Sequence, residues 1–281
     1  MHALKVLLHL SSFAVLLLSN AVAQAAMVDC RPPEAARFVV FLSEPQYSPT
    51  AFSKREDMLR FFNRLQEYLD QRRDSEMAGI KRIDFRVARC EKRVPAPDGH
   101  DFTNDVVRNL YDRGVVVEIW GTLDVKQQGG KPVSPTAQIN YLLVPVKRGV
   151  VEGSDKVPGI HRFNYPDAEI VATDFVDLIS NMDLHAFVAT AIGVMAFDGE
   201  DFALAHEMLC KAGSQLSRTE KRLALKAETK SQSEGIQQLR VFLRDLAGKA
   251  IVEARQKPSA AVPAFARLLE PSNPCSEEPP K

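Results

Sequence analysis

The chain has 281 residues, of which 45% are hydrophobic and 26% are charged, and these values are typical of a globular protein. Lysine and arginine together number 36 and are balanced by 36 aspartate and glutamate residues. This balance argues against a nucleic-acid partner, because no net positive field attracts one. The length is sufficient for one large or two small domains, each with a hydrophobic core.

Residues 1–26 have the order of a secretory signal peptide. Lys5 precedes an apolar run from Val6 to Leu18, and Ala21-Val22-Ala23 and Ala23-Gln24-Ala25 offer small-x-small cleavage sites. We therefore expect a periplasmic or secreted protein that begins near residues 25–27. We expect no transmembrane segment, because no later segment approaches the roughly 20 apolar residues that span a bilayer.

From the leader to residue 170, strand patterns alternate with helix patterns. Strands are predicted at 38–42, 80–90, 115–125, 137–146 and, from a weaker pattern, 159–165, and helices at 52–73 and 104–111. The first strand is apolar at every position, which suits burial on both faces, and Gly114 is expected to end the second helix. This order predicts a layered α/β domain with a mixed sheet over residues 27–170.

Residues 171–256 have the periodicity of helices. Helices are predicted near 174–180, over 184–197, from the tight connection 199–201 through Lys211, and as one or two further helices over 219–256. Residues 257–281 contain six prolines and predict an extended tail. The predicted fold class is α+β, in which an α/β domain is followed by an all-α segment.

Residues 38–146 resemble the amino-terminal α/β domain of the TolB family and the related domains of CsgG-type and cyclase-associated tetratricopeptide proteins. The resemblance rests on Phe38–Leu42, the strand ending at Cys90, the helix Val106–Tyr111 and the run Gly114–Leu123 with Gly121 near its middle, followed by a returning strand. It implies a periplasmic α/β domain. No β-propeller follows, so the translocation role of TolB is not carried over.

A second segment resembles a single tetratricopeptide (TPR) hairpin. The resemblance implies close helix packing and a partner-binding groove, with neighbouring helices at 174–180 and 219–256 covering the open faces. The residues on its two helix faces are Ala189, Ile192, Gly193, Ala196, Phe202, Ala205, Leu209 and Ala212.

The four cysteines, Cys30, Cys90, Cys210 and Cys275, are dispersed and contain no C-x-x-C pair. In an oxidising compartment four such cysteines indicate two disulfides, for which three connectivities are open. We favour Cys30–Cys90 and Cys210–Cys275, because each pair then joins one half of the chain to itself. Buried free thiols are the alternative.

Few residues have the pattern of a chemical site. The loop Asp98-Gly99-His100-Asp101 places two carboxylates beside an imidazole, but a solvated turn is favoured because no third or fourth metal ligand is near. His185 and His206 lie on the two helices of the hairpin at a separation on the order of 10 Å along its axis, too far apart for one ion. His161 is interpreted as a surface or edge residue. Gly129-Gly130-Lys131 is interpreted as a hairpin loop.

No catalytic residue, metal ligand or cofactor is predicted, since the common motifs for hydrolases, phosphate loops, dinucleotide folds and zinc proteases are absent from the sequence. The leading hypothesis is a non-catalytic adaptor of the bacterial cell envelope that binds another envelope protein. The alternative is a small-ligand-binding protein or an enzyme whose site is assembled from distant residues. A third is a subunit that functions as a homo-oligomer.

Overall fold

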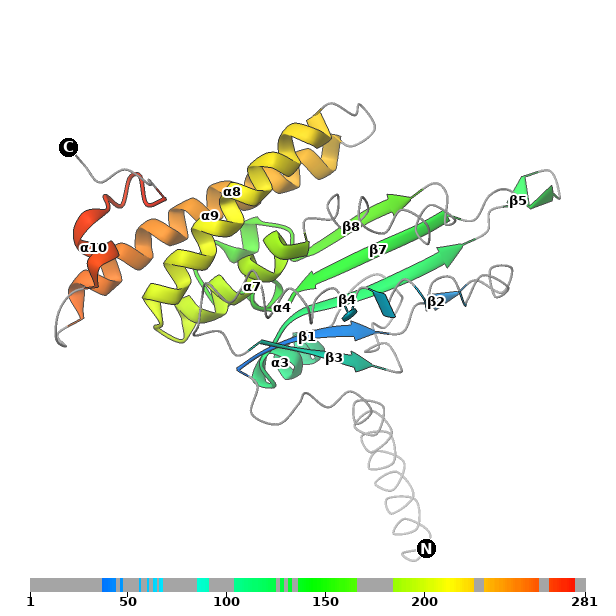
Figure 1. The fold of residues 1–281 in the computed structure, drawn as a ribbon, viewed down its shortest axis with the longest axis horizontal. Helices are drawn as coiled ribbons and strands as arrows, with labels where there is room; N and C mark the ends of the chain where they lie inside the picture. The colour runs from blue at the N-terminus through cyan, green and yellow to red at the C-terminus, as the bar shows by residue number, and fades with distance from the viewer. Residues whose placement is uncertain are drawn as a thin grey trace, which may run out of the picture.

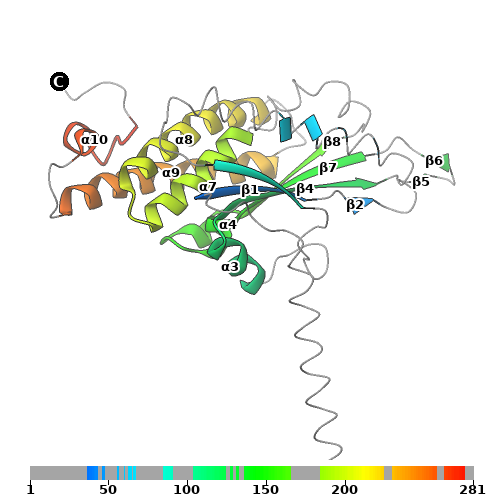
Figure 2. The same cartoon turned by 60° about the horizontal axis from the view of Figure 1, so that its bottom comes forward.

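The structure is a computed structural model of the full chain. It describes residues 37–43, 46–47, 56, 60, 63–64, 66–67, 85–90, 104–124, 127–128, 131–132, 136–165, 184–224, 230–257 and 263–275. These residues form a mixed β-sheet with helices on both faces (Figures 1 and 2). The predicted α+β class, with a mixed sheet followed by a helical segment, is confirmed.

The sheet has the strand order β3-β1-β4-β7-β8. Strands β1, β3 and β4 are mutually parallel where they pair, and β7 is antiparallel to both β4 and β8. All six residues of β1 are buried, as its uninterrupted apolar sequence predicts for a strand flanked by parallel neighbours. The strands are β1 (Phe38–Ser43), β3 (Phe85–Cys90), β4 (Val115–Asp124), β7 (Thr136–Leu143) and β8 (Ile160–Tyr165).

Three short strands complete the β structure. Strand β2 (Gln46–Tyr47) pairs with β4 beyond the end of β1, and it is parallel to β4. Strands β5 (Gln127–Gln128) and β6 (Lys131–Pro132) form a separate antiparallel pair. Of the predicted hairpin loop Gly129-Gly130-Lys131, Lys131 belongs to β6, and residues 129–130 lie outside the described residues.

One face of the sheet is covered by α3 (Asn104–Asp112) and the short α4 (Val144–Arg148). Helix α3 packs Val107 and Leu110 onto the sheet. It is followed by Gly114 at φ 74°, the left-handed conformation that allows a tight turn into β4.

Helix α4 corrects the predicted strand over 137–146. Strand β7 ends at Leu143, and Pro145 lies in the first turn of the helix that follows. Proline suits this place because its fixed φ is helical and its missing N–H is not needed there. Gly149, at φ 71°, ends the helix.

The other face of the sheet is covered by α7 (Leu184–Asp198), over which α8 (Phe202–Ala224) and α9 (Lys230–Gln256) form a further layer (Figures 1 and 2). Helix α7 has no polar face, and 11 of its 15 residues are buried. A helix that is apolar all round needs partners all round. The sheet, α7, α8 and α9 accordingly share one hydrophobic core, which continues across the predicted boundary at residue 170.

The helix ends differ from the prediction in two places. Helix α8 does not end near Lys211 but continues to Ala224, and α9 begins only at Lys230. The buried stripe of α8 continues through Leu216, which gives the extra turns a core to pack on. The predicted helix near 174–180 and most of the predicted helix over 52–73 lie outside the described residues.

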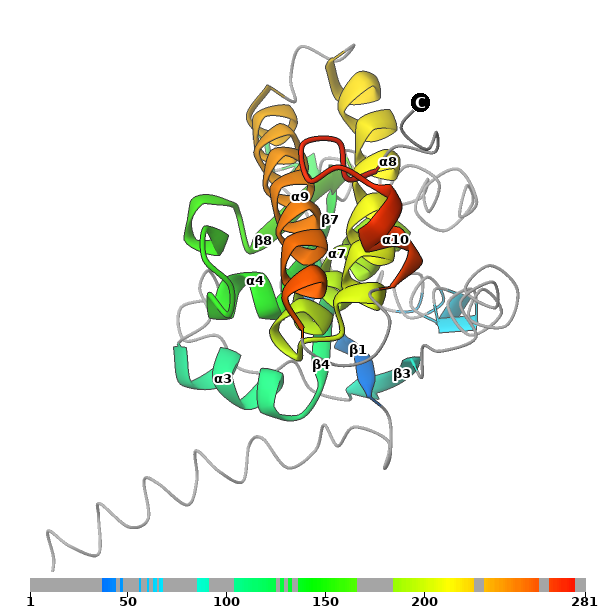
Figure 3. The same ribbon diagram turned by 90° about the vertical axis from the view of Figure 1, so that its left-hand side faces the viewer.

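The C-terminal segment, residues 263–275, is packed against α9 instead of being extended throughout (Figure 3). It contains the short helix α10 (Ala264–Leu268), and the Arg255 guanidinium donates hydrogen bonds to the carbonyls of Ala266 (2.6 Å) and Leu269 (2.8 Å). A Cβ at Gly248 would lie 2.5 Å from the Pro271 carbonyl oxygen, so the segment lies directly on the α9 backbone. Among the described residues, no helix combines the length and hydrophobicity needed to cross a membrane.

Candidate functional site

The eight residues of the predicted partner groove lie at the interface between α7 and α8, and all are buried. Gly193 allows the close approach, because a Cβ there would lie 2.9 Å from the Leu209 side chain. Ala189, Ile192, Ala196, Phe202, Ala205 and Ala212 belong to the same buried set. These residues pack the hairpin, and only Leu209 among them also lines a surface hollow.

A large hollow lies on the outer side of α8 and α9. It has a volume of about 1360 Å³, and three residues of the C-terminal segment, Leu269, Pro274 and Cys275, contribute to its lining. We call it the α8–α9 groove. It is lined by Ala203, His206, Glu207, Leu209, Cys210, Lys211, Gly213, Ser214, Gln215, Ser217, Arg218, Lys221, Gln237, Arg240, Val241, Arg244, Leu269, Pro274 and Cys275.

The groove is basic. Its lining contains five lysines and arginines against a single acidic residue, Glu207. The cations of α8 are Lys211, Arg218 and Lys221, of which the last two are exposed. The three residues lie on one face of the helix, because their spacings of seven and three residues are close to whole helical turns. This local excess contrasts with a whole chain of zero net charge.

The two cations that α9 contributes differ in their surroundings. Arg240 forms an ion pair with Glu220 of α8 that joins the two helices across the groove. Arg244 is 3.8 Å from Asp245, and both side chains are 64% exposed, so this pair is well screened by water. Within the part of the chain that the structure describes, Lys211, Arg218 and Lys221 form no ion pair.

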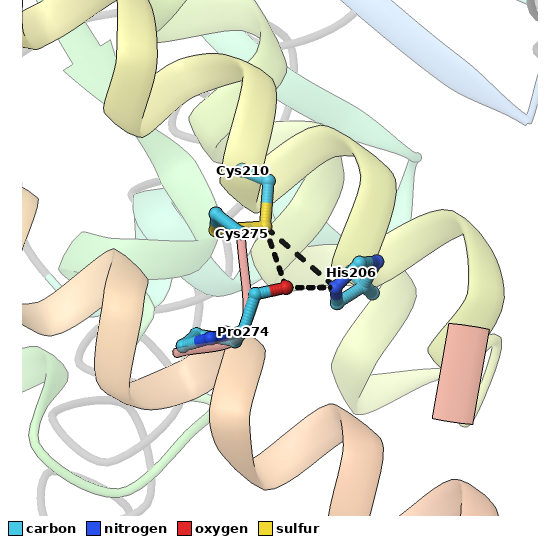
Figure 4. The surroundings of a disulfide bond; sticks show 4 residues. All are labelled: His206, Cys210, Pro274 and Cys275. Atoms are coloured by element: carbon cyan, nitrogen blue, oxygen red, sulfur yellow. Dashed lines mark hydrogen bonds between the residues drawn. A yellow bond between two sulfur atoms is a disulfide. The ribbon is translucent and has the colours of Figure 1, made fainter. Parts of the chain in front are cut away.

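A disulfide between Cys210 and Cys275 fixes the C-terminal wall of the groove (Figure 4). The two Cα atoms are 5.3 Å apart, and 65 residues separate the cysteines in the sequence. Beside the bond, Nε2 of His206 lies 2.6 Å from the Pro274 carbonyl oxygen, which fixes the tautomer with the proton on Nε2. Burial lowers the pKa of His206, and the Pro274 hydrogen bond opposes this shift.

The other predicted disulfide involves Cys30, which lies outside the described residues. Cys90, at the end of β3, is itself disulfide-bonded. Among the described residues no cysteine is free. The three described cysteines, Cys90, Cys210 and Cys275, are therefore all disulfide-bonded, as is typical of proteins in oxidising compartments.

Within the sheet, a small polar cluster faces the α3 side. The Ser43 hydroxyl donates a 2.7 Å hydrogen bond to the buried carboxylate of Glu118. Asn140 on β7 is also buried, and neither polar atom of its amide has a hydrogen-bond partner in the described structure. Buried polar groups of this kind need an explanation, because each unmade hydrogen bond is costly.

His161 is predicted to be a surface or edge residue, and it does lie on the edge strand β8. It is not a surface residue, because α7 covers that face of β8: it is 8% exposed, and the ring centroids of His161 and Phe187 are 4.6 Å apart. His206 instead lines the groove. Among the described residues, no group of three or more His, Cys, Asp and Glu side chains could hold a metal ion. The loop 98–101 lies outside the described residues.

A second hollow of about 470 Å³ lies on the other side of α9, against the loop at residues 152–157. Gln237 and Val241 line both hollows, and the Val241 side chain, at 48% exposure, forms the ridge between them. The outward face of α9 is therefore bordered by a hollow on each side.

The sequence contained a signal for the basic groove that its interpretation missed. Lys211, Arg218 and Lys221 recur at intervals of seven and three, and Arg240 and Arg244 are four apart. Such spacings predict one basic face on each helix. What the spacing does not provide is the antiparallel register that brings the two faces together.

Comparison of the chain with protein-family models, curated proteins and solved structures gives no match.

Proposed function

We propose that this chain is an exported, non-catalytic adaptor of the bacterial cell envelope that binds another envelope protein through the α8–α9 groove. The observation that carries the proposal is the groove itself. Small-molecule pockets are usually about 300–1,000 Å³. This groove is larger, at about 1360 Å³, and eight of its nineteen lining residues have charged or amide side chains.

Export is supported by the order of residues 1–26 and by the disulfide bonding of the three described cysteines. The resemblance of residues 38–146 to TolB-type and CsgG-type domains, and of the hairpin to a TPR unit, supports a protein-binding role in the same compartment. A homo-oligomer is one form that such binding takes.

Two exposed valines on α9 provide a matched test. Val241 is 48% exposed on the groove, whereas Val252 is 37% exposed on the same helix and lines neither hollow. With a photo-reactive phenylalanine derivative at each position in turn, irradiation of the envelope fraction should give a discrete crosslinked protein from position 241 only. Equal crosslinking at both positions, or at 252 alone, would remove the groove as the binding surface.

The alternative is a small-ligand protein or enzyme whose site is built around Glu118. The observation that favours it is the buried polar cluster of Ser43, Glu118 and Asn140. This alternative predicts that some metabolite-sized compound raises the melting temperature of the wild type but not of Glu118→Gln. A thermal-shift screen that finds no such compound, together with crosslinking at Val241, favours the adaptor.

A further inference from the structure

We propose that the ligand of the α8–α9 groove is an extended, acidic polypeptide segment, an inference that rests on the proposed protein-binding function. Five cations line the groove against one carboxylate. Three of the cations, Lys211, Arg218 and Lys221, form no ion pair within the described part of the chain. Their charge is therefore available to a partner.

One cation of the groove lining, Arg240, already holds a carboxylate of this chain. Glu220 of α8 crosses to Arg240 of α9, and both side chains are partly buried, at 20% and 35% exposure respectively. The guanidinium group matches carboxylate geometry. A second carboxylate entering along α8 would meet Arg218 and Lys221 in the same way.

The dimensions fit a short extended segment. The ten-residue step from Lys211 to Lys221 corresponds to about 15 Å along α8, at 1.5 Å per residue. An extended peptide covers this length with roughly five residues, at about 3.3 Å each. Two or three acidic side chains on one side of such a segment can reach the three cations of α8.

A polypeptide fits the groove better than a carbohydrate or nucleic-acid polyanion because the lining is not uniformly basic. Val241 and Leu269 provide apolar surface among the cations, and Gln215 and Gln237 place amide groups beside them. Apolar side chains and peptide groups of an acidic segment match these surfaces, whereas a sulfated sugar or a phosphate backbone offers no apolar partner.

The test uses a fluorescein-labelled ten-residue peptide with six glutamates and two valines, and a matched peptide in which glutamine replaces every glutamate. Fluorescence anisotropy measures binding to the full mature chain at 50 and 300 mM NaCl. The acidic peptide should bind and the glutamine peptide should bind at least tenfold more weakly. The acidic peptide should bind more weakly at 300 mM than at 50 mM NaCl, because salt screens exposed charge pairs.

Charge reversal locates the site. The double variant Arg218→Glu, Lys221→Glu should bind the acidic peptide at least tenfold more weakly than the wild type. Arg108→Glu with Arg148→Glu, at exposed positions of α3 and α4 on the opposite face of the sheet, changes the net charge equally and should leave binding within about twofold. Equal weakening by both pairs would overturn the proposal in favour of non-specific attraction.

Two further outcomes would overturn it. A sulfated oligosaccharide or a single-stranded DNA oligomer that binds more tightly than the peptide, with the same dependence on Arg218 and Lys221, would assign the groove to that polymer. Equal affinities for the acidic and glutamine peptides would show that the groove does not recognise the charge of its ligand.

The crosslinking test separates this inference from the proposed function. If position 241 crosslinks to an envelope protein but the acidic peptide does not bind, the adaptor function is supported and the acidic nature of the ligand is refuted. If the acidic peptide binds at the groove but position 241 crosslinks to no protein, the acidic nature of the ligand is supported and the adaptor function is refuted.

Discussion

Acidification should destabilise the folded protein through His161 of β8. Burial lowers the pKa of this imidazole to about 4, and its hydrogen bond to the Pro158 backbone opposes the shift only in part. The neutral ring is therefore favoured in the folded state. Between pH 6.5 and pH 4 the unfolded chain binds a proton that the folded protein does not, so stability is full above pH 6.5 and is lost as the pH falls.

The magnitude follows from the two pKa values. With a pKa of about 4 when folded and 6.5 when unfolded, His161 alone costs about 2 kcal/mol between pH 7 and pH 5, and about 3 kcal/mol by pH 4. Replacement by leucine removes the titrating group. His161→Leu loses the hydrogen bond to Pro158, but this loss is independent of pH.

The assay is urea denaturation at pH 7 and pH 5, followed by the fluorescence of Trp120. This residue is the single tryptophan of the chain and is buried in the sheet at 3% exposure. The free energy of unfolding should fall by about 2 kcal/mol less in His161→Leu than in the wild type. Other groups whose pKa is lowered, such as His206, contribute equally to both proteins.

A matched control distinguishes titration from general weakening of the core. Thr190 of α7 is buried one turn beyond Phe187, and its hydroxyl donates a 2.7 Å hydrogen bond to the Ala186 carbonyl. Thr190→Val removes this bond without removing a titratable group, so its pH dependence should parallel that of the wild type. Parallel pH dependence of all three proteins would refute the burial of a neutral His161.

Three other expectations concern packing, the disulfide and export. Gly193→Ala should destabilise the fold by roughly 1–3 kcal/mol, because the new Cβ meets Leu209 of α8. Gly213→Ala, whose Cβ would have no atom within 4 Å, should be neutral or stabilise the fold by up to about 1 kcal/mol. Equal unfolding midpoints of the two variants in urea would contradict this expectation. Replacing Cys210 and Cys275 by alanine should lower the free energy of unfolding by at most about 4 kcal/mol, because the disulfide closes a loop with a sequence separation of 65. The same change should expose the C-terminal segment to trypsin. An unchanged tryptic digest would argue that the disulfide does not hold this segment in place. Amino-terminal sequencing of the envelope-fraction protein should find a start near residues 25–27, and an intact leader would contradict export.

The sheet was predictable because its signals are local. Continuous apolar residues in β1 and alternation in β7 identify strands, and Gly114 marks the end of α3 where a left-handed residue is needed. The end of β7 was missed, since apolar residues continue through Val146 although a helix with Pro145 in its first turn begins at Val144. Burial alone does not distinguish a strand from a short helix at such a position.

Contacts between distant elements were less predictable. His161 lies on an edge strand beside Arg162, which is exposed, and only the position of α7 explains its burial. The uniformly apolar sequence of α7 does indicate burial on all sides, but the TPR-like interpretation took its neighbours from other helices, whereas the sheet also packs against it. The basic groove likewise needs the pairing of α8 with α9, which no local pattern specifies.

The arrangement separates the residues that hold the fold from those proposed to bind. Ala189, Gly193 and Ala205 lie inside a core that the sheet shares with the helices, so changes there alter stability and binding together. Arg218 and Lys221 are exposed and form no ion pair in the described structure, so their reversal should leave the free energy of unfolding within about 0.5 kcal/mol of the wild-type value. A loss of binding in that variant can therefore be attributed to the groove. The same loss in a Gly193 variant cannot, because the sheet would be disturbed as well.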